Sequence, residues 1–276
     1  MNPRAYVPAY LEHRYALAHP ELTNAARELV HEQIERDPDR YATDDGARAL
    51  VSYMRVQEEL LDGLLRMEDL PDGDFERDRS ALFERARTQL AAIMRTDPHC
   101  VDARLVAIQL AEVPLDACLG DMLQLERETR ERLVMSRPGF DPDIEGLWRE
   151  SALAASEDAG ELTARDPEVI GWLHTVEALA QGCIFTARSR AAASYARTVM
   201  RAHGYPNLAV GTLFLALARL EDEDGFFAAA RDAGEGAEDL PWFLLGRTIL
   251  LYKLGQRRSA RRALRDFAAR CDGGAV

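Results

Sequence analysis

Apolar residues recur every three to four positions along most of the chain, the spacing that places them on one face of an α-helix. Ala, Leu, Arg and Glu are abundant and aromatic residues make up only 7%, which favours helix over strand. No run of alternating Val, Ile, Thr and aromatic residues predicts a strand. The pattern predicts about fourteen helices. The clearer ones span 7–18, 22–36, 43–67, 75–96, 101–112, 115–135, 142–157, 168–184, 188–203, 207–220, 223–232, 239–254 and 257–271.

The last part of the chain predicts a helical hairpin. An apolar helix ends at Gly255, and a second helix begins after a very short turn at Arg257. Gly255 accommodates a left-handed residue at a helix end, and Ala260 is small enough to let two antiparallel helices approach closely. A helix–turn–helix unit of about 34 residues cannot bury its apolar face alone, so other units must stack on it. The hairpin therefore predicts a stacked array.

Three Asp-Pro pairs are predicted to mark corners between repeats. Proline disfavours helix in the residue before it and suits the first turn of the next helix, so each pair ends one helix and begins another. The pairs start at Asp37, Asp97 and Asp166. Successive aspartates lie 60 and 69 residues apart, and each interval fits two units of about 34 residues. Eleven positions before each aspartate stands a small residue: Ala26, Ala86 and Ala155. A fourth pair, Asp141-Pro142, is predicted to begin the helix over 142–157.

These features resemble the tetratricopeptide repeat (TPR) family. In the last unit the resemblance is carried by Tyr252, Lys253, Leu254, Gly255, Ala260, Leu264 and Phe267. The Asp-Pro corners add to it, and Trp172 and Trp242 stand near the starts of first helices, where the family often has an aromatic residue. The resemblance implies an all-α fold, a right-handed superhelix (α-solenoid) of antiparallel helix hairpins. We expect one domain over 1–276, irregular over 1–165 and more regular over 166–276.

The resemblance also implies a binding surface. First helices of such hairpins line a concave groove, so ligand contacts would come from their polar and aromatic residues. The candidates that it implies are Asp45, Tyr53, Asp102, Gln109, Glu112, His174, Gln181, Tyr252 and Lys253. A groove of this mixed character suits an extended or helical peptide.

The last predicted helix has one strongly basic face. Its basic residues are Arg257, Arg258, Arg261, Arg262 and Arg265. At about 100° per residue, they centre about 140° away from the set formed by Ala260, Ala263, Leu264 and Phe267, which is predicted to be packed. Two hypotheses stay open for the basic face. It is a solvated cap that keeps the array soluble, or it docks an acidic partner or an acidic surface of another copy of the chain.

The formal net charge of −13 argues against a general nucleic-acid binder, because phosphate contacts require a basic surface. The expected partner is therefore a protein or a peptide, and a homo-oligomer is possible. No stretch approaches eighteen apolar residues, and the first residues lack a basic segment followed by an apolar run. We expect a cytoplasmic protein that does not enter a membrane.

No pattern in the chain indicates catalysis. The sequence has no Gly-rich phosphate loop and no Gly-x-Ser-x-Gly elbow. His31-Glu32 begins like a zinc-protease sequence, but Glu35 stands where the second histidine is required. The cysteines are far apart and are predicted to be reduced and mostly buried. They are Cys100, Cys118, Cys183 and Cys271. We therefore predict no catalytic residue, no cofactor and no metal.

The leading prediction is a non-enzymatic scaffold that binds a peptide or protein segment in a concave helical groove. Two alternatives stay open. One is a helical small-molecule sensor or enzyme with an enclosed pocket in the middle of the chain, near His174 and Trp148. The other is a self-assembling structural protein that uses the arginine-rich last helix.

Overall fold

The computed structural model describes residues 1–154, 158–206 and 208–271. Within these residues the chain is all-α, with fourteen α-helices, and its β-structure is a single bridge between Phe140 and Trp148. The chain divides into two compact units. Unit 1 comprises Met1–Asp141 and Gly146–Thr175, and unit 2 comprises Pro142–Glu145 and Val176–Val276. The single array expected over 1–276 stays a prediction.

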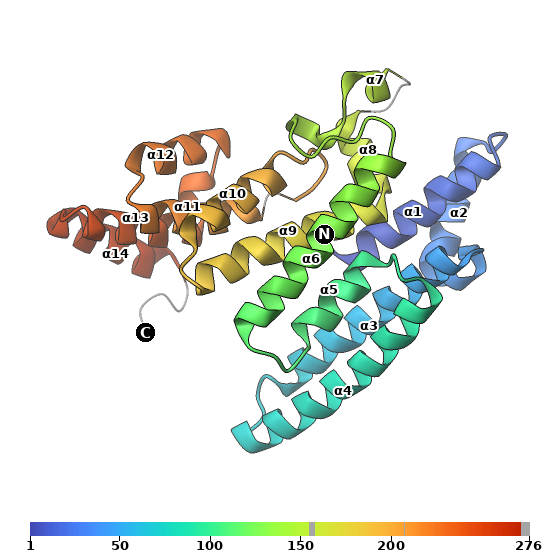
Figure 1. Ribbon diagram of the computed structural model, residues 1–276, viewed down its shortest axis with the longest axis horizontal. Coiled ribbons are helices and arrows are strands. Elements are labelled where there is room, and N and C mark those ends of the chain that lie inside the picture. The colour runs from blue at the N-terminus through green and yellow to red at the C-terminus, as the bar shows by residue number, and fades with distance from the viewer. Residues whose placement is uncertain (155–157, 207, 272–276) are drawn as a thin grey trace. The chain divides into compact units, whose positions relative to one another are not determined.

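Unit 1 contains eight helices and the first half of a ninth (Figure 1). They are α1 (Pro3–Ala18), α2 (Asn24–Arg36), α3 (Asp45–Met67), α4 (Asp72–Thr96), α5 (Val101–Gln109), α6 (Leu115–Ser136), α7 (Glu150–Leu153), α8 (Ala159–Arg165) and α9 (Pro167–Phe185). Several begin with a side chain that accepts a hydrogen bond from the first turn, an N-cap. The capping residues are Asn2, Thr23, Asp44 and Asp158.

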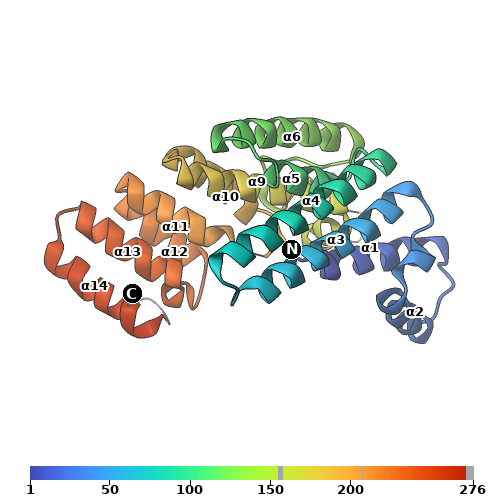
Figure 2. The same cartoon turned by 90° about the horizontal axis from the view of Figure 1, so that it is seen from below.

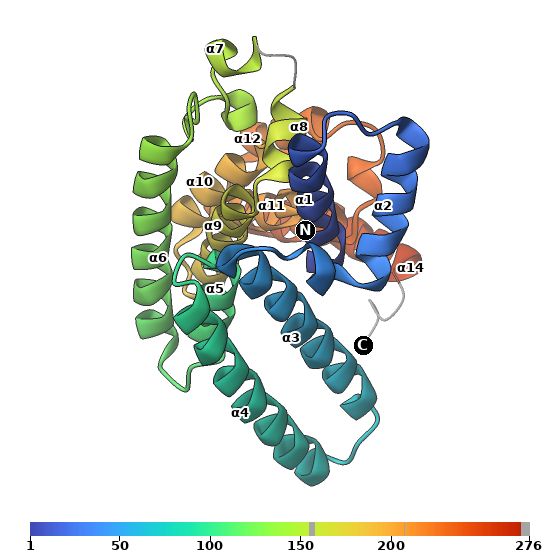
Figure 3. The same cartoon turned by 90° about the vertical axis from the view of Figure 1, so that its right-hand side faces the viewer.

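Successive helices of unit 1 pack against each other, α3 on α4, α4 on α5 and α5 on α6, while α1 contacts α2, α3 and α8. Helices α3 and α4 form a long hairpin whose turn lies away from α1 (Figure 3). The two helices approach closely at Gly63, where a Cβ atom would lie 2.6 Å from Cδ2 of Leu82. Its core includes the fully buried side chains of Leu11 in α1, Leu90 in α4 and Leu125 in α6.

The three Asp-Pro corners are confirmed as helix ends. Asp37 ends α2, Asp97 ends α4, and Asp166 ends α8 immediately before α9 begins at Pro167. Of the three small residues expected near them, Ala86 is buried and Ala26 is partly buried, and Ala155 lies outside the described residues.

The helix predicted over 142–157 is wrong in its described part. Asp141-Pro142 leads into a tight turn, in which Asp141 N–H donates to the carbonyl of Leu147 and Arg149 N–H donates to that of Gly139. Gly146 and Leu147 have positive φ angles of 75° and 68°, which no α-helix can contain. The helix that follows this turn, α7, has only four residues.

Unit 2 contains the second half of α9 and five further helices. They are α10 (Ser189–Met200), α11 (Ala209–Leu220), α12 (Glu223–Asp232), α13 (Pro241–Lys253) and α14 (Arg257–Arg270). Helix α11 contacts α10, α12 and α13, and α13 contacts α14, as Figure 2 shows. Helix α11 is thus covered by the helix before it and by the two helices that follow it.

The same joint occurs three times in unit 2. The joints follow α9, α11 and α13, and each contains a residue with a positive φ, at 57°, 62° and 77°. These residues are Ala187, Glu221 and Gly255, and successive ones lie 34 positions apart. The next N–H donates to a carbonyl five residues back, a bond that satisfies a helix end. The bonds are Arg188 to Cys183, Asp222 to Leu217 and Gln256 to Leu251. The left-handed conformation predicted at Gly255 is confirmed.

Aromatic residues fill the space between successive hairpins of unit 2. The ring of Phe243 in α13 lies 5.4 Å from that of Phe214 in α11 and 5.1 Å from that of Phe226 in α12. Beside them, Gly211 lies under Trp242, where a Cβ atom would be 2.7 Å from the indole. These contacts fix how α13 lies on the α11–α12 hairpin.

Alanines are the only fully buried residues of helix α14. Ala260 and Ala263 are buried and form a cluster with Leu251 of α13. Leu264, predicted to be packed, is 49% exposed, and Phe267 is partly buried. Leu264 lies at the border between the alanine and arginine faces, because Arg261 precedes it by three positions and Arg257 by seven.

The repeated joint predicts opposite effects for two substitutions. Ala187 is exposed and holds a left-handed φ that glycine adopts without strain, so Ala187→Gly is expected to stabilise the protein by about 1 kcal/mol. Gly255→Ala should destabilise it by about the same amount, because it places a Cβ in that conformation. Urea unfolding measures both changes. Destabilisation by Ala187→Gly would contradict the equivalence of the joints.

Candidate functional site

Unit 1 contains a buried polar centre around Asp102. This residue lies in the first turn of α5 and is 3% exposed. Its carboxylate accepts a hydrogen bond from the Tyr6 hydroxyl of α1, and its Oδ1 lies 2.7 Å from Nδ1 of His174 in α9. On the other side of the imidazole, the Met1 amino group lies 2.6 Å from Nε2. The centre therefore ties together α1, α5 and the unit 1 part of α9.

Two tyrosines and one cysteine near Asp102 are held in their neutral forms. Burial, with the Asp102 charge as a second cause, raises the pKa of Tyr6 well above its ordinary value, and the same causes act on the pKa of Tyr53 in α3. Burial also raises the pKa of the Cys100 thiol to about 12. Tyr6 therefore keeps its proton and donates a hydrogen bond to the carboxylate. Cys100 is a protonated thiol at neutral pH, unsuited to act as a nucleophile.

Two of the predicted groove residues therefore lie in the core. Asp102 and Tyr53 were expected on a concave surface, but both are buried among α1, α3 and α5. The physical reason is that the Asp102 carboxylate is paired internally by Tyr6 and His174, which lowers the cost of burying a charge. His174 is itself only 16% exposed at its side chain.

A pocket of about 210 Å³ opens beside this centre. Two of the predicted Asp-Pro corners meet there, since Asp97 and Asp166 both line it. The other lining residues are Tyr10, Gly46, Leu50, His99, Cys100, Val101, Asp102, Arg137, Arg165, Pro167 and Glu168. Neither His174 nor Trp148 lines it, so the pocket differs in place from the one that the sequence suggested.

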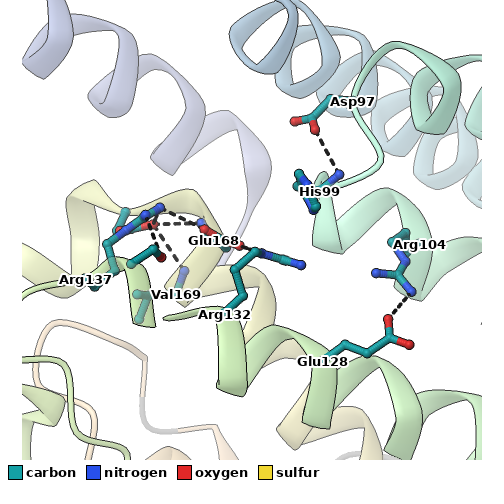
Figure 4. A network of polar contacts seen from close by, with 10 residues as sticks. Asp97, His99, Arg104, Glu128, Arg132, Arg137, Glu168 and Val169 are labelled. Carbon is teal, nitrogen blue, oxygen red and sulfur yellow. Dashed lines mark hydrogen bonds and ion pairs between the residues drawn. The ribbon is translucent and has the colours of Figure 1, made fainter. Parts of the chain in front are cut away.

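The charged groups around this pocket pair with one another. Arg137 binds Asp166 and places Nη2 2.8 Å from Glu168, which Arg132 also contacts. Figure 4 shows Arg132 and Arg137 directed at Glu168, and Arg104 directed at Glu128. Asp166 in addition accepts hydrogen bonds from the first N–H groups of α9. Because these charges already compensate each other, we interpret the network as a junction that fixes α6 to the start of α9.

Unit 2 presents a different kind of surface, a groove of about 570 Å³ between its last two helices. We name it the terminal groove. It is lined by Thr248, Ile249 and Tyr252 of α13 and by Arg257, Ala260, Arg261 and Leu264 of α14. Tyr252 is 65% exposed and Leu264 is 49% exposed, so two apolar residues of the lining are open to solvent.

The arginines of α14 are available for binding. All five side chains of its basic face are exposed, and none takes part in an ion pair with another described residue. The same helix has a paired arginine, Arg270, which contacts Asp239. Exposed guanidinium groups beside an apolar groove favour carboxylate-bearing ligands, because each can donate two parallel hydrogen bonds.

The structure brings three predicted binding residues together in the terminal groove: Tyr252, Arg257 and Arg261. Their neighbours Arg258, Arg262 and Arg265 lie on the same helix outside the lining. Sequence analysis missed Thr248 and Ile249, and it assigned Leu264 to the core. For Leu264, the signal in the sequence was its position at the border of the arginine face, three residues after Arg261 and seven after Arg257.

The other predicted residues do not gather at one site. Asp45 pairs with Arg48 at 2.6 Å, and Glu112 pairs with Arg87 at 3.2 Å. Lys253 donates to the carbonyl of Arg219 and lies 3.1 Å from Glu221, so it supports the preceding joint. Gln109 and Gln181 are exposed. A concave groove made by these residues stays a prediction.

Comparison with protein-family models, with curated proteins and with solved structures gave no significant match. Among the described residues, no group of three or more His, Cys, Asp or Glu side chains is arranged to hold a metal ion. No described helix is long and apolar enough to span a membrane. Of the four free cysteines, Cys100 and Cys183 are buried. The geometry of the two units is therefore the evidence on function.

Removing one hydroxyl group from the buried polar centre is predicted to have a large effect on the stability of the protein. Tyr6→Phe removes a donor to the buried Asp102 carboxylate, so the free energy of unfolding should fall by about 1–3 kcal/mol. The matched control is Tyr10→Phe on the same helix, whose partly buried hydroxyl lies 3.4 Å from Arg14. Urea unfolding compares the two variants. Equal losses would show that the Asp102 contact has no special weight.

Proposed function

We propose that this chain is a TPR-like helical repeat protein, a non-enzymatic scaffold that binds an acidic helical segment of a protein partner. In this proposal the hairpins stack as a right-handed superhelix, and the partner segment lies in the terminal groove. The observation that carries the proposal is that the terminal groove is an uncovered stacking face, rimmed by arginines that pair with no described residue.

The three equivalent joints support the repeat architecture. A spacing of 34 residues between them is the length of a helix–turn–helix repeat of the TPR type. The residues five positions after each joint, Ala192, Phe226 and Ala260, are all buried. One local structure thus recurs at a fixed period, although only the last copy has the residues that carry the resemblance in sequence.

The preceding hairpin supports a helix as the ligand. Phe214 and Phe226 lie 34 positions before Thr248 and Ala260 of the terminal groove. In the preceding hairpin, these two positions contact the ring of Phe243 on the next helix, α13. By equivalence, the terminal groove presents the surface on which a further helix would pack. A partner helix would occupy it with apolar residues at positions i, i+3 and i+4.

Charge supports an acidic ligand. Arg257 and Arg261 stand at one rim of the terminal groove, and the remaining arginines extend the basic face along α14. In this proposal carboxylates on a partner helix contact Arg257 and Arg261 while its apolar residues contact Tyr252 and Leu264. The net charge of −13 opposes a nucleic-acid ligand, since most of the protein would repel phosphates.

Fluorescence anisotropy tests this proposal with a defined probe, a labelled synthetic amphipathic peptide with leucines on one helical face and glutamates elsewhere. Wild type should bind it, and higher salt should weaken binding because the arginines are exposed. Arg257→Glu combined with Arg261→Glu should lower the affinity by about tenfold or more, since two attractive contacts become repulsive.

The matched control is Arg258→Glu combined with Arg262→Glu, which changes the net charge equally but lies outside the lining of the terminal groove. It should lower the affinity by no more than about threefold. The same probe with lysines in place of glutamates should not bind. Equal losses of affinity for the two double variants would show that the arginines attract the peptide only through their overall charge. That result would contradict a site in the terminal groove.

A further inference from the structure

The far end of α3 in unit 1 has an exposed apolar face. Leu61 and Leu65 are 46% and 67% exposed and stand four positions apart, so they are neighbours on one side of the helix. Asp62 adjoins Leu61 in α3, and Glu68 and Asp69 follow directly after the end of the helix at Met67. We call the set Leu61, Asp62, Leu65, Glu68 and Asp69 the acidic tip.

Two of the three carboxylates of the acidic tip have no ion-pair partner among the described residues, and the third, Asp62, interacts with Arg4. Glu68 and Asp69 are exposed, and neither takes part in an ion pair with another described residue. Arg66 is the only basic residue between positions 62 and 76, and its Nε donates to the backbone carbonyl of Asp62. The acidic tip therefore keeps a negative field next to two exposed leucines.

The acidic tip is also held in shape before any partner arrives. It lies at the turn between α3 and α4, which extends away from α1 (Figure 3). The close approach of Gly63 to Leu82 fixes α3 against α4 in this region. A preformed helical segment loses little conformational freedom on binding, so more of the contact energy remains as affinity.

These features complement those of the terminal groove in unit 2. One surface offers a helix with two leucines and acidic neighbours, and the other offers an uncovered apolar floor between two helices with arginines at the rim. We propose that the acidic tip of one copy of this chain docks into the terminal groove of a second copy. This rests on the proposed function of the terminal groove and names its partner.

Such association has a direction. The two surfaces differ, so the contact is heterologous, and a pair keeps one free terminal groove on one copy and one free acidic tip on the other. Pairing of two tips or of two grooves would bring like charges together and is disfavoured. The expected products are therefore head-to-tail oligomers that grow with protein concentration and dissociate when salt screens the charges.

Sedimentation velocity of the full chain tests this with two variants. The tip variant carries Glu68→Lys and Asp69→Lys, and the groove variant carries Arg257→Glu and Arg261→Glu. Wild type should shift to larger species with concentration, whereas each variant alone should stay monomeric. An equal mixture of the variants should associate again. The unchanged tip of the groove variant meets the unchanged groove of the tip variant, and the new lysines of the one meet the new glutamates of the other.

Two further proteins make the result specific. Asp121→Lys with Glu131→Lys alters two exposed acidic residues of α6 that form no ion pair with another described residue, and this control should associate like wild type. A charge-swapped chain with all four tip and groove substitutions should regain association, because it restores opposite charges at the contact. Circular dichroism checks that each variant keeps the helix content of wild type.

A wild-type chain that stays monomeric at every concentration and salt would overturn the inference. So would variants that remain monomeric when mixed, or a control that dissociates like the tip variant. The glutamate-rich probe separates this failure from failure of the proposed function. If wild type is monomeric but binds the probe through Arg257 and Arg261, the terminal groove stands and a different acidic protein is its partner.

Discussion

A pair of antiparallel helices leaves apolar surface that it cannot cover by itself, and the structure of unit 2 depends on this constraint. Helix α11 contacts α10, α12 and α13, so its apolar residues are covered on several sides at once. Phe243 supplies the cover for the α11–α12 hairpin by contacting Phe214 and Phe226. The last hairpin faces the same requirement with a smaller core of alanines and leaves Tyr252 and Leu264 exposed. Its exposed surface therefore combines apolar residues with the arginines of α14.

Unit 1 meets the same requirement with polar groups as well as apolar ones. Its helices are longer and less regular, and Asp102 at the start of α5 is buried with Tyr6 and His174 as partners. A carboxylate in the core carries a desolvation cost that hydrogen bonds offset only when their geometry is fixed. The helices that supply the partners are therefore fixed in position along with it.

The sequence carried clear signals for some of this architecture. Gly255 and the Asp-Pro corners could be predicted because glycine and proline restrict the backbone directly. The joints at Ala187 and Glu221 could not, since these residue types do not signal a positive φ and adopt it under the surrounding packing. The prediction of a helix over 142–157 was wrong because the spacing of apolar residues does not indicate that Gly146 and Leu147 adopt positive φ angles.

The candidate site was predicted in part for similar reasons. Charge pattern identified Arg257 and Arg261, and Tyr252 was a candidate that the resemblance to the tetratricopeptide repeat family implied. The burial of Asp102 and Tyr53 could not be foreseen, because it depends on Tyr6 and His174, which are far away in the chain. Polar residues on a predicted helix indicate a surface only when no distant partner satisfies them.

The constant spacing of the joints also bears on how such a chain can change its length. Because Ala187, Glu221 and Gly255 occur in the same register, a segment of 34 residues that is duplicated or deleted between two of them meets matching backbone geometry at both ends. A gene encoding this region can therefore gain or lose a whole hairpin without a new kind of joint. The arginines of α14 would keep their place on the last hairpin, so the proposed binding surface would stay the same while the number of hairpins varies.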